Sequence, residues 1–346
     1  MNMILDSQHP EAIQQYLSRR GWICEDEPVV AVEKPGEGNM NYILRVRTGL
    51  SGSGQGSRSL IVKQSRPYVE KYPSIAAPAE RAVIEGQFYR KTQTIPALNA
   101  YQPNLLDLDS DHNILVMEDL GAASDFTNLY QPGVVITDDE LNALIHYVGT
   151  LHNQFRQATP DPAFANAAMR ALNHEHIFRY PFMIDNGFDL DTVQPGLQAA
   201  AMPYKQNEAL KTTVTQLGTV YLGDTQRGAD FTLLHGDYYP GSWLRTPDGQ
   251  LTAGIKVIDP EFCFYGPAEF DLGVMVAHLH LSEQPDSIIE AAQTQYNRSP
   301  GFDEQLLRKF TGVEMIRRLI GLAQLPLSLS LKKKVELLAL AERMLN

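Results

Sequence analysis

The sequence has few cysteines, a deficit of cationic residues and no long apolar run. Its two cysteines, Cys24 and Cys263, stand far apart and in no metal-ligand spacing, which is typical of a reducing compartment. The 29 Lys and Arg against 41 Asp and Glu leave a net charge of -12, which disfavours a nucleic-acid or anionic-membrane surface. No apolar run reaches the ~18 residues of a membrane span. The first residues show no secretory pattern. We therefore expect a cytoplasmic chain that binds neither nucleic acid nor membrane.

The pattern of the chain changes about a third of the way along its 346 residues. β-branched and alternating residues predict three antiparallel strands near 28–34, 40–48 and 58–65, followed by a helix over 78–93 and a strand over 113–120. Beyond Gly121 the pattern is mostly helical, with one β-rich stretch at 231–262. We expect an α+β chain with a β-rich lobe at 1–119, a helical lobe at 120–346, and a ligand cleft between them.

Two acidic clusters carry the strongest chemical signal. "HGD" ends at Asp237 and "DPE" begins at Asp259, with a strand, a turn and a strand between them. This order places the two carboxylates on neighbouring loops at one edge of a small sheet. Converging carboxylates favour Mg²⁺, and a separate carboxylate can align a hydroxyl. Phosphoryl transfer needs both functions. Taken singly, either aspartate could instead cap a turn, and His235 is typical of a loop brace.

Several stretches resemble one family of enzymes. "HGDYYPGSWL" and "KVIDPEF" are similar to the catalytic and metal loops of small-molecule kinases in the aminoglycoside phosphotransferase and choline kinase superfamily. "GEGNMNYILRV", "DPEFCFYGPAEFDLG" and "EMIRRLIGLA" point within it to the methylthioribose kinases. The resemblance implies a bilobal protein-kinase-like fold, with a small antiparallel β-rich N-lobe that binds nucleotide and a larger helical C-lobe. It also implies ATP and Mg²⁺ as cofactors.

The resemblance assigns roles to the acidic loops. Asp237 is the implied catalytic residue, which accepts or orients the acceptor hydroxyl. Asp259 and Glu261 are the implied Mg²⁺ ligands. Ser242 stands where most relatives carry a metal-binding Asn, and methylthioribose kinases also carry Ser there. Asp271 has the sequence context of a helix N-cap, and the resemblance implies that it braces the catalytic loop.

The first lobe carries the implied nucleotide site. The turn "PGEGNMNY" would cover the phosphates with Gly36, Gly38, Asn39 and Asn41. Lys63 stands among apolar neighbours on a strand and needs a partner, which Glu85 on the following helix can provide. The alternative is a strand-edge lysine that faces water. In the family, such a lysine holds the nucleotide phosphates. Adenine would contact the linking segment, through the residues Met117, Glu118 and Leu120.

The acceptor site is less defined by the sequence. Arg317 and Arg318 lie in an apolar helix, where one of them could pair with Glu314. The resemblance instead places the pair near the catalytic carboxylate. Tyr238 and Tyr239 stand where relatives often carry Leu-His, so we expect them to reshape the sugar pocket, with Tyr238 as a substrate residue. We expect a small-molecule substrate, best identified as 5-methylthioribose or a related sugar. An aminoglycoside, a choline-like amine or homoserine are alternatives, and a catalytically silent nucleotide-binding module is an alternative of another class. The oligomeric state stays open, with a homodimer as one option.

Overall fold

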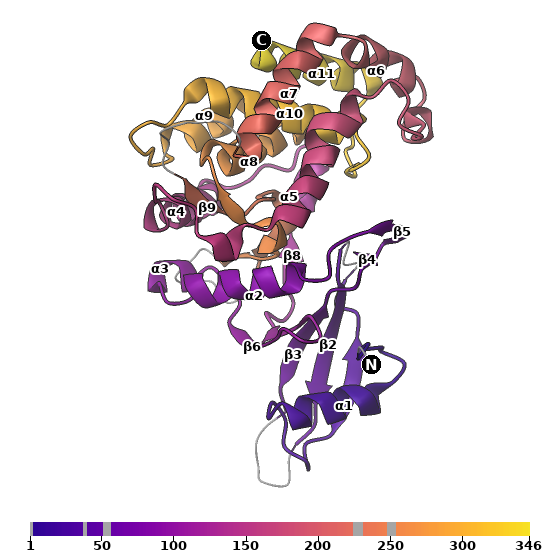
Figure 1. Ribbon diagram of the computed structural model, residues 1–346, viewed down its shortest axis with the longest axis vertical. Helices are drawn as coiled ribbons and strands as arrows, with labels where there is room; N and C mark the ends of the chain where they lie inside the picture. Colours follow the sequence, from indigo (N-terminus) through magenta and orange to yellow (C-terminus); the bar gives the residue numbers. More distant parts are fainter. Residues whose placement is uncertain (1–2, 37–39, 51–56, 224–230, 248–253) are drawn as a thin grey trace. The chain divides into compact units, whose positions relative to one another are not determined.

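The computed structural model divides the chain into two compact units, Met1–Gly121 and Ala122–Asn346. It describes residues 3–36, 40–50, 57–223, 231–247 and 254–346. Sequence patterns place the division between 119 and 120, close to this boundary. Each unit has its own core and is described by itself (Figure 1). Among the described residues, no helix has the length and apolar character needed to span a bilayer.

The first unit is built on a five-stranded antiparallel sheet in the order β1-β2-β3-β7-β6. Its strands are β1 (Val29–Glu33), β2 (Tyr42–Thr48), β3 (Ser59–Gln64), β6 (Leu105–Asp109) and β7 (Ile114–Glu118). A short hairpin, β4 (Tyr68–Val69) and β5 (Tyr72–Ala76), lies outside this sheet. The strands predicted near 28–34, 40–48, 58–65 and 113–120 are confirmed as β1, β2, β3 and β7.

Helices cover both faces of this sheet, which is why its central strand is buried. Helix α1 (Pro10–Arg19) packs its residues Ile13, Tyr16 and Leu17 against Leu44 and Val62 on one face (Figure 1). On the other face, α2 (Arg81–Thr92) approaches β6 and β7 so closely that a Cβ at Gly86 would stand 2.8 Å from the side chains of Leu108 and Leu115. Pro78 precedes α2 instead of lying in its first turn. The short α3 (Pro96–Asn99) follows.

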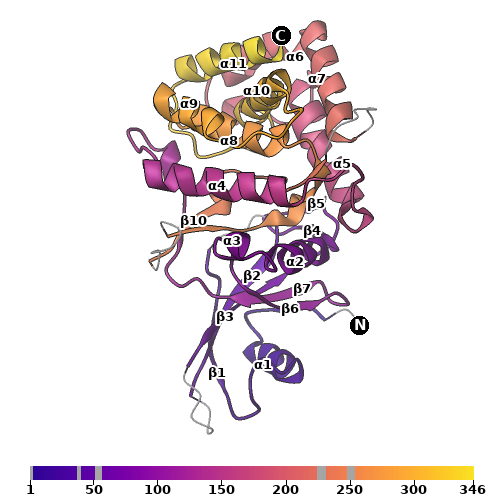
Figure 2. The ribbon, with the colours of Figure 1, turned by 90° about the vertical axis from the view of Figure 1, so that its left-hand side faces the viewer.

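The second unit is mainly helical, as predicted. Its α-helices are α4 (Asp138–Gln154), α5 (Ala167–His174), α6 (Leu197–Lys205), α7 (Glu208–Tyr221), α8 (Glu269–Leu281), α9 (Asp286–Thr294), α10 (Glu304–Ile320) and α11 (Leu331–Leu345). Helix α8 is apolar on nearly all sides, which is typical of a helix surrounded by protein. Helix α10 packs against both α8 and α11 (Figure 2). Helices α8 and α10 therefore form the interior of the unit, and α11 covers α10 with its buried side.

Short β-strands within the second unit position the acidic loops. Strands β11 (Ile255–Val257), β10 (Trp243–Arg245) and β8 (Ser124–Asp125) form one antiparallel sheet, and β12 (Phe264–Gly266) pairs with β9 (Thr232–Leu234) in another. Single 3₁₀ turns, Pro240–Ser242 and Pro260–Phe262, precede β10 and β12. Asp237 lies between β9 and the first of these turns, and Asp259 lies between β11 and the second.

Candidate active site

The two acidic loops of the second unit lie side by side. Trp243 at the start of β10 pairs with Val257 at the end of β11, so both loops leave the sheet at the same edge. The His235 ring approaches the Ile258 carbonyl oxygen to 2.9 Å and braces one loop on the other. Gly236 has φ +87°, and a Cβ there would stand 2.1 Å from the Phe262 carbonyl oxygen. The predicted proximity of the two loops, and His235 as a brace, are confirmed.

A buried carboxylate holds the backbone of the "HGD" loop. Asp271 Oδ2 accepts the His235 amide at 2.7 Å, and its Oδ1 accepts the Gly236 amide at 3.0 Å. On its other side His152 Nε2 lies 3.1 Å from Asp271 Oδ2, and the Tyr296 hydroxyl lies 2.7 Å from His152 Nδ1. The predicted brace is confirmed. The predicted N-cap is wrong, because α8 begins at Glu269 and places Asp271 inside its first turn.

Asp237 faces the two arginines of α10. Arg318 Nη2 donates to Asp237 Oδ1 at 3.1 Å, and Arg317 Nη1 lies 3.8 Å from the same oxygen. Glu314 accepts from both guanidinium groups, at 3.1 Å from Arg317 and 2.6 Å from Arg318. Burial alone would raise the pKa of the Glu314 carboxyl, but the two guanidinium groups hold it well below its usual range. The structure thus combines the two predicted alternatives, because each arginine contacts both Glu314 and Asp237.

The predicted metal ligands Asp259 and Glu261 lie on the second loop, and Ser242 lies beside it. Asp259 is half-buried, and its backbone lies in the left-handed region with φ 63°. Asn166 donates to the Glu261 and Cys263 carbonyl oxygens and fixes the backbone that follows. Within the described residues, no three His, Cys, Asp or Glu side chains form a ready metal cage. Mg²⁺ usually binds one or two carboxylates and completes its shell with water and phosphate oxygens, so Asp259 and Glu261 fit such a donor set.

Ser242 acts as a brace in this structure. Its hydroxyl donates to the Asp237 carbonyl oxygen at 3.0 Å, its carbonyl accepts the Ile258 amide, and its side chain is buried. The hydroxyl proton therefore holds the "HGD" loop, and coordination of Mg²⁺ by Ser242 stays a prediction.

In the first unit, Lys63 and Glu85 form the predicted ion pair. Lys63 Nζ lies 2.7 Å from Glu85 Oε2 and 2.9 Å from Oε1, with side chains 3% and 1% exposed. Lys63 lies on the central strand β3, on the face that α2 covers. The alternative of a lysine facing water is therefore wrong. A role toward nucleotide phosphates stays a prediction.

An arginine that the sequence did not single out organises the strand after the glycine turn. Arg81 is buried and uses all five N–H donors of its guanidinium group. They donate to Asn41 Oδ1 and to the carbonyl oxygens of Met40, Arg66, Tyr68 and Pro78. Asn41 Oδ1 also accepts from Ser65, so the Asn41 side chain braces the strand. Gly36 is exposed at a bend. Gly38 and Asn39 lie outside the described residues.

The predicted adenine segment is fixed to the sheet of the first unit. The Glu118 amide donates to the Asn104 carbonyl at 2.9 Å, and the Glu118 carboxylate accepts from the Asn104 side chain. Asp119 binds Arg45 and the Ser59 hydroxyl. Met117 is buried and Leu120 is half-buried. The Glu118 amide is thus already engaged with Asn104, and a contact of this segment with adenine stays a prediction.

The structure corrects the prediction for Tyr238. This side chain is fully buried, and its hydroxyl donates to the Leu144 carbonyl oxygen in α4 at 2.8 Å. It packs in the core and is not placed to contact a substrate. Its neighbour Tyr239 is the tyrosine on the arginine side, with its ring centre 4.8 Å from the Arg318 guanidinium carbon.

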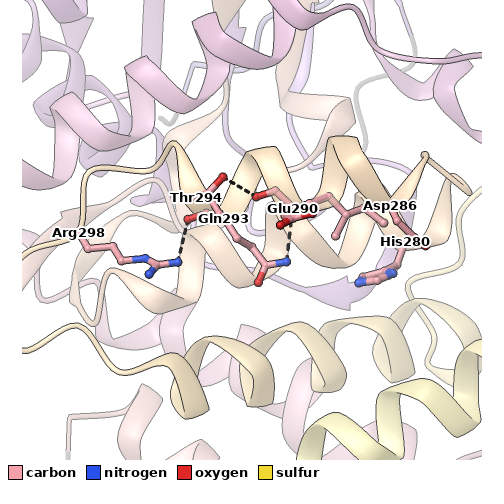
Figure 3. Close-up of a pocket in the computed structure, with 7 residues that line it drawn as sticks. His280, Asp286, Glu290, Gln293, Thr294 and Arg298 are labelled. Carbon is pink, nitrogen blue, oxygen red and sulfur yellow. Dashed lines mark hydrogen bonds between the residues drawn. The ribbon is translucent and has the colours of Figure 1, made fainter.

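A surface hollow of about 340 Å³ lies elsewhere in the second unit (Figure 3). Helix α9, the end of α8 and a following arginine supply its lining residues, which are His280, Asp286, Ile289, Glu290, Gln293, Thr294 and Arg298. None of the predicted site residues lines it.

The chain is similar in sequence to curated enzymes of one name. Methylthioribose kinase of Exiguobacterium sibiricum is 27% identical over 86% of this chain and 81% of that enzyme. Methylthioribose kinase of Bacillus cereus is 28% identical over 78% of this chain, and the match spans 64% of that enzyme, just under two thirds of its length.

Two solved structures share the fold. Choline kinase LicA from Streptococcus pneumoniae superposes with a TM-score of 0.52 at 15% identity, covering 98% of this chain and 99% of that one. A microcompartment-associated aminopropanol kinase gives 0.53 at 14% identity, covering 97% and 95%. The predicted α+β kinase-like fold is confirmed.

The profile described as "Phosphotransferase enzyme family" matches residues 37–310. The prediction of a phosphotransferase of the small-molecule kinase type is confirmed, and the chain belongs to the phosphotransferase enzyme family.

Proposed function

We propose that this protein is an ATP- and Mg²⁺-dependent kinase that transfers the γ-phosphoryl group to a hydroxyl of 5-methylthioribose or a related sugar. The observation that carries the proposal is the Asp237 carboxylate, which lies in a braced loop against the Asp259 loop and faces two arginines. A carboxylate in this setting suits the alignment of a hydroxyl, and fixed cations suit the charge of a transferring phosphoryl group.

The residues of the second unit divide the chemistry between them. Asp237 Oδ1 is held by Arg318, whereas Oδ2 makes no hydrogen bond within the described residues and is left to accept the hydroxyl hydrogen of the acceptor. Arg317 and Arg318 stabilise negative charge beside that hydroxyl. Asp259 and Glu261 would hold Mg²⁺, which when bound neutralises phosphate oxygens. Lys63, held by Glu85, would bind the nucleotide phosphates from the first unit.

The charges around Asp237 favour a neutral acceptor. A cationic aminoglycoside or choline-like amine gains little here, because the Asp237 carboxylate that would attract it is already paired with two guanidinium groups. An anionic acceptor gains little either, because Glu314 and Asp237 already balance the two arginines. A neutral polyol needs no such charge pairing. The names of the curated relatives support a sugar of the methylthioribose type.

The alternative of a silent nucleotide-binding module is tested by the same experiment as the kinase. We expect Mg²⁺-dependent ATP consumption with 5-methylthioribose in a panel that also holds ribose, an aminoglycoside, choline and homoserine. The Asp237→Asn variant is the matched control and should turn over at least about 100-fold more slowly. Thermal stabilisation by Mg-ATP without turnover on any acceptor would favour the silent module. Turnover on choline alone would refute the charge argument.

A further inference from the structure

Glu314 has a further contact beyond the two arginines, at the same Oε1 atom that accepts from Arg318 Nε. His278 Nε2 on α8 lies 3.3 Å from Glu314 Oε1, and the Tyr130 hydroxyl lies 2.6 Å from His278 Nδ1. Tyr130 ends the 3₁₀ turn Thr127–Tyr130, so three elements far apart in the chain meet here. All three side chains are buried. The resulting order of contacts is Tyr130, His278, Glu314, Arg318 and Asp237.

The hydrogen-bonding chemistry of these groups fixes which of them donates and which accepts in each contact. An ionised carboxylate only accepts hydrogen bonds, so His278 must carry its proton on Nε2 to donate to Glu314. A neutral imidazole then accepts at Nδ1, and the Tyr130 hydroxyl is the donor that faces it. Burial lowers the pKa of His278 to about 4, which keeps the ring neutral at pH 7. Each donor therefore has one acceptor, and the network has a single arrangement.

The same order of groups already supports the "HGD" loop in this structure. There, Tyr296 contacts His152, His152 contacts Asp271, and Asp271 binds the loop amides. Asp271 and His278 lie on α8, about two turns apart and hence on one face. One Tyr–His–carboxylate series thus fixes the backbone that carries Asp237, and the other ends on the guanidinium group that contacts its side chain.

We propose that Glu314, oriented by His278 and Tyr130, is a positioning residue that fixes the Arg318 guanidinium against Asp237. The geometry divides this guanidinium between two carboxylates, with Nε 2.6 Å from Glu314 and Nη2 3.1 Å from Asp237. The Tyr239 ring packs against both Arg318 and His278 and closes a third side. The inference rests on the proposed function, because Arg318 matters here as a group beside the acceptor hydroxyl.

A mutant cycle separates this role from a purely structural one. Tyr130→Phe removes one hydroxyl and keeps the ring, so the protein should fold. We expect kcat to fall about tenfold, near the middle of the usual coupling range, with little change in the KM for ATP. In an Arg318→Lys background the same substitution should change kcat less than about twofold, since lysine cannot contact both carboxylates. The control is Tyr221→Phe, another buried tyrosine whose hydroxyl accepts from Asn173, which should lower stability without changing kcat.

Equal losses in both backgrounds, or an equal loss in Tyr221→Phe, would overturn the proposal. A second readout does not depend on turnover. In arginine-labelled protein the Nε–H resonance of Arg318 should be protected from exchange in the wild type and in Tyr221→Phe, and exposed in Tyr130→Phe and Glu314→Gln. If the wild type phosphorylates no acceptor, the proposed function fails, and this resonance still decides whether the network positions Arg318. If the Arg318 Nε–H exchanges as slowly in Tyr130→Phe as in the wild type, the proposed positioning role of the network is refuted.

Discussion

The buried ion pair of the first unit offers the sharpest separation of stability from function. Lys63→Met removes the ammonium group that lies 2.7 Å from Glu85 Oε2, while the Glu85 side chain, 1% exposed, stays in the interior. Breaking a buried pair on one side typically costs about 3–5 kcal/mol, because an uncompensated charge stays in the interior. We therefore expect Lys63→Met to lose that much unfolding free energy in the first unit.

Replacing both partners should reverse most of this loss. Lys63→Met with Glu85→Leu exchanges the pair for apolar side chains of similar length, a change that is commonly neutral or stabilising by up to about 4 kcal/mol. The double variant should thus recover the stability of the wild type. It should not recover nucleotide affinity, because the lysine that we propose to hold the phosphates is still absent.

The two tryptophans make the measurement specific to each unit. Trp22 lies in the first unit and Trp243 in the second, so fluorotryptophan resonances report the urea unfolding of each separately. Calorimetric titration with Mg-ATP gives the affinity. A single variant as stable as the wild type would contradict the burial argument. Wild-type ATP affinity in the double variant would contradict the role of Lys63.

Three further predictions concern the second unit. First, its unfolding free energy should fall by about 3 kcal/mol between pH 6.5 and 4, because burial holds the folded pKa of His278 at about 4 and the unfolded chain takes up the proton first. The groups that face this histidine are Tyr130, Tyr239, Glu314, Arg318 and Asp237. The pKa of Glu314 is also lowered, so protonation of its unfolded form reduces the unfolding free energy further below about pH 4.5. A urea-derived unfolding free energy that stays constant from pH 7 to 4 would contradict this. Second, Asp271→Asn should cost about 2 kcal/mol and lower kcat, since an amide NH₂ group then faces backbone N–H donors; unchanged kcat with intact folding would contradict the brace. Third, Gly236→Ala should abolish turnover, because its Cβ collides with the Phe262 carbonyl and separates the two loops; an active, fully stable variant measured by the kinase assay would refute the contact.

Local patterns in the sequence predicted those features that a single short stretch encodes. The alternation of β2 and β3, the apolar neighbours of Lys63 and the strand–turn–strand between Asp237 and Asp259 each follow from residue order alone. Together with the patterns of β1 and β7, they predicted four of the five strands of the sheet, the ion pair and the adjacent acidic loops, whereas β6 was not predicted.

Features that depend on distant backbone groups or on the direction of a loop were not predictable in this way. Arg81 binds mostly carbonyl oxygens, which every residue has, so its partners leave no signal in the sequence. Tyr238 and Tyr239 are adjacent and chemically identical, and only the turn of the loop decides which one enters the core. Tyr130 and His278 meet across 148 positions, and no local pattern relates them.

A comparison of the wild type with Asp237→Asn on 5-methylthioribose and Mg-ATP tests the proposed catalytic role of Asp237. Single-turnover measurements should show transfer slowed by about 10²–10⁴-fold, the range for a positioned acid–base group, while the Kd for Mg-ATP stays within about twofold, as expected for a group that acts in the transition state. Near-normal transfer in Asp237→Asn, or a loss of ATP affinity as large as the loss of rate, would contradict the role of Asp237 in aligning the acceptor hydroxyl.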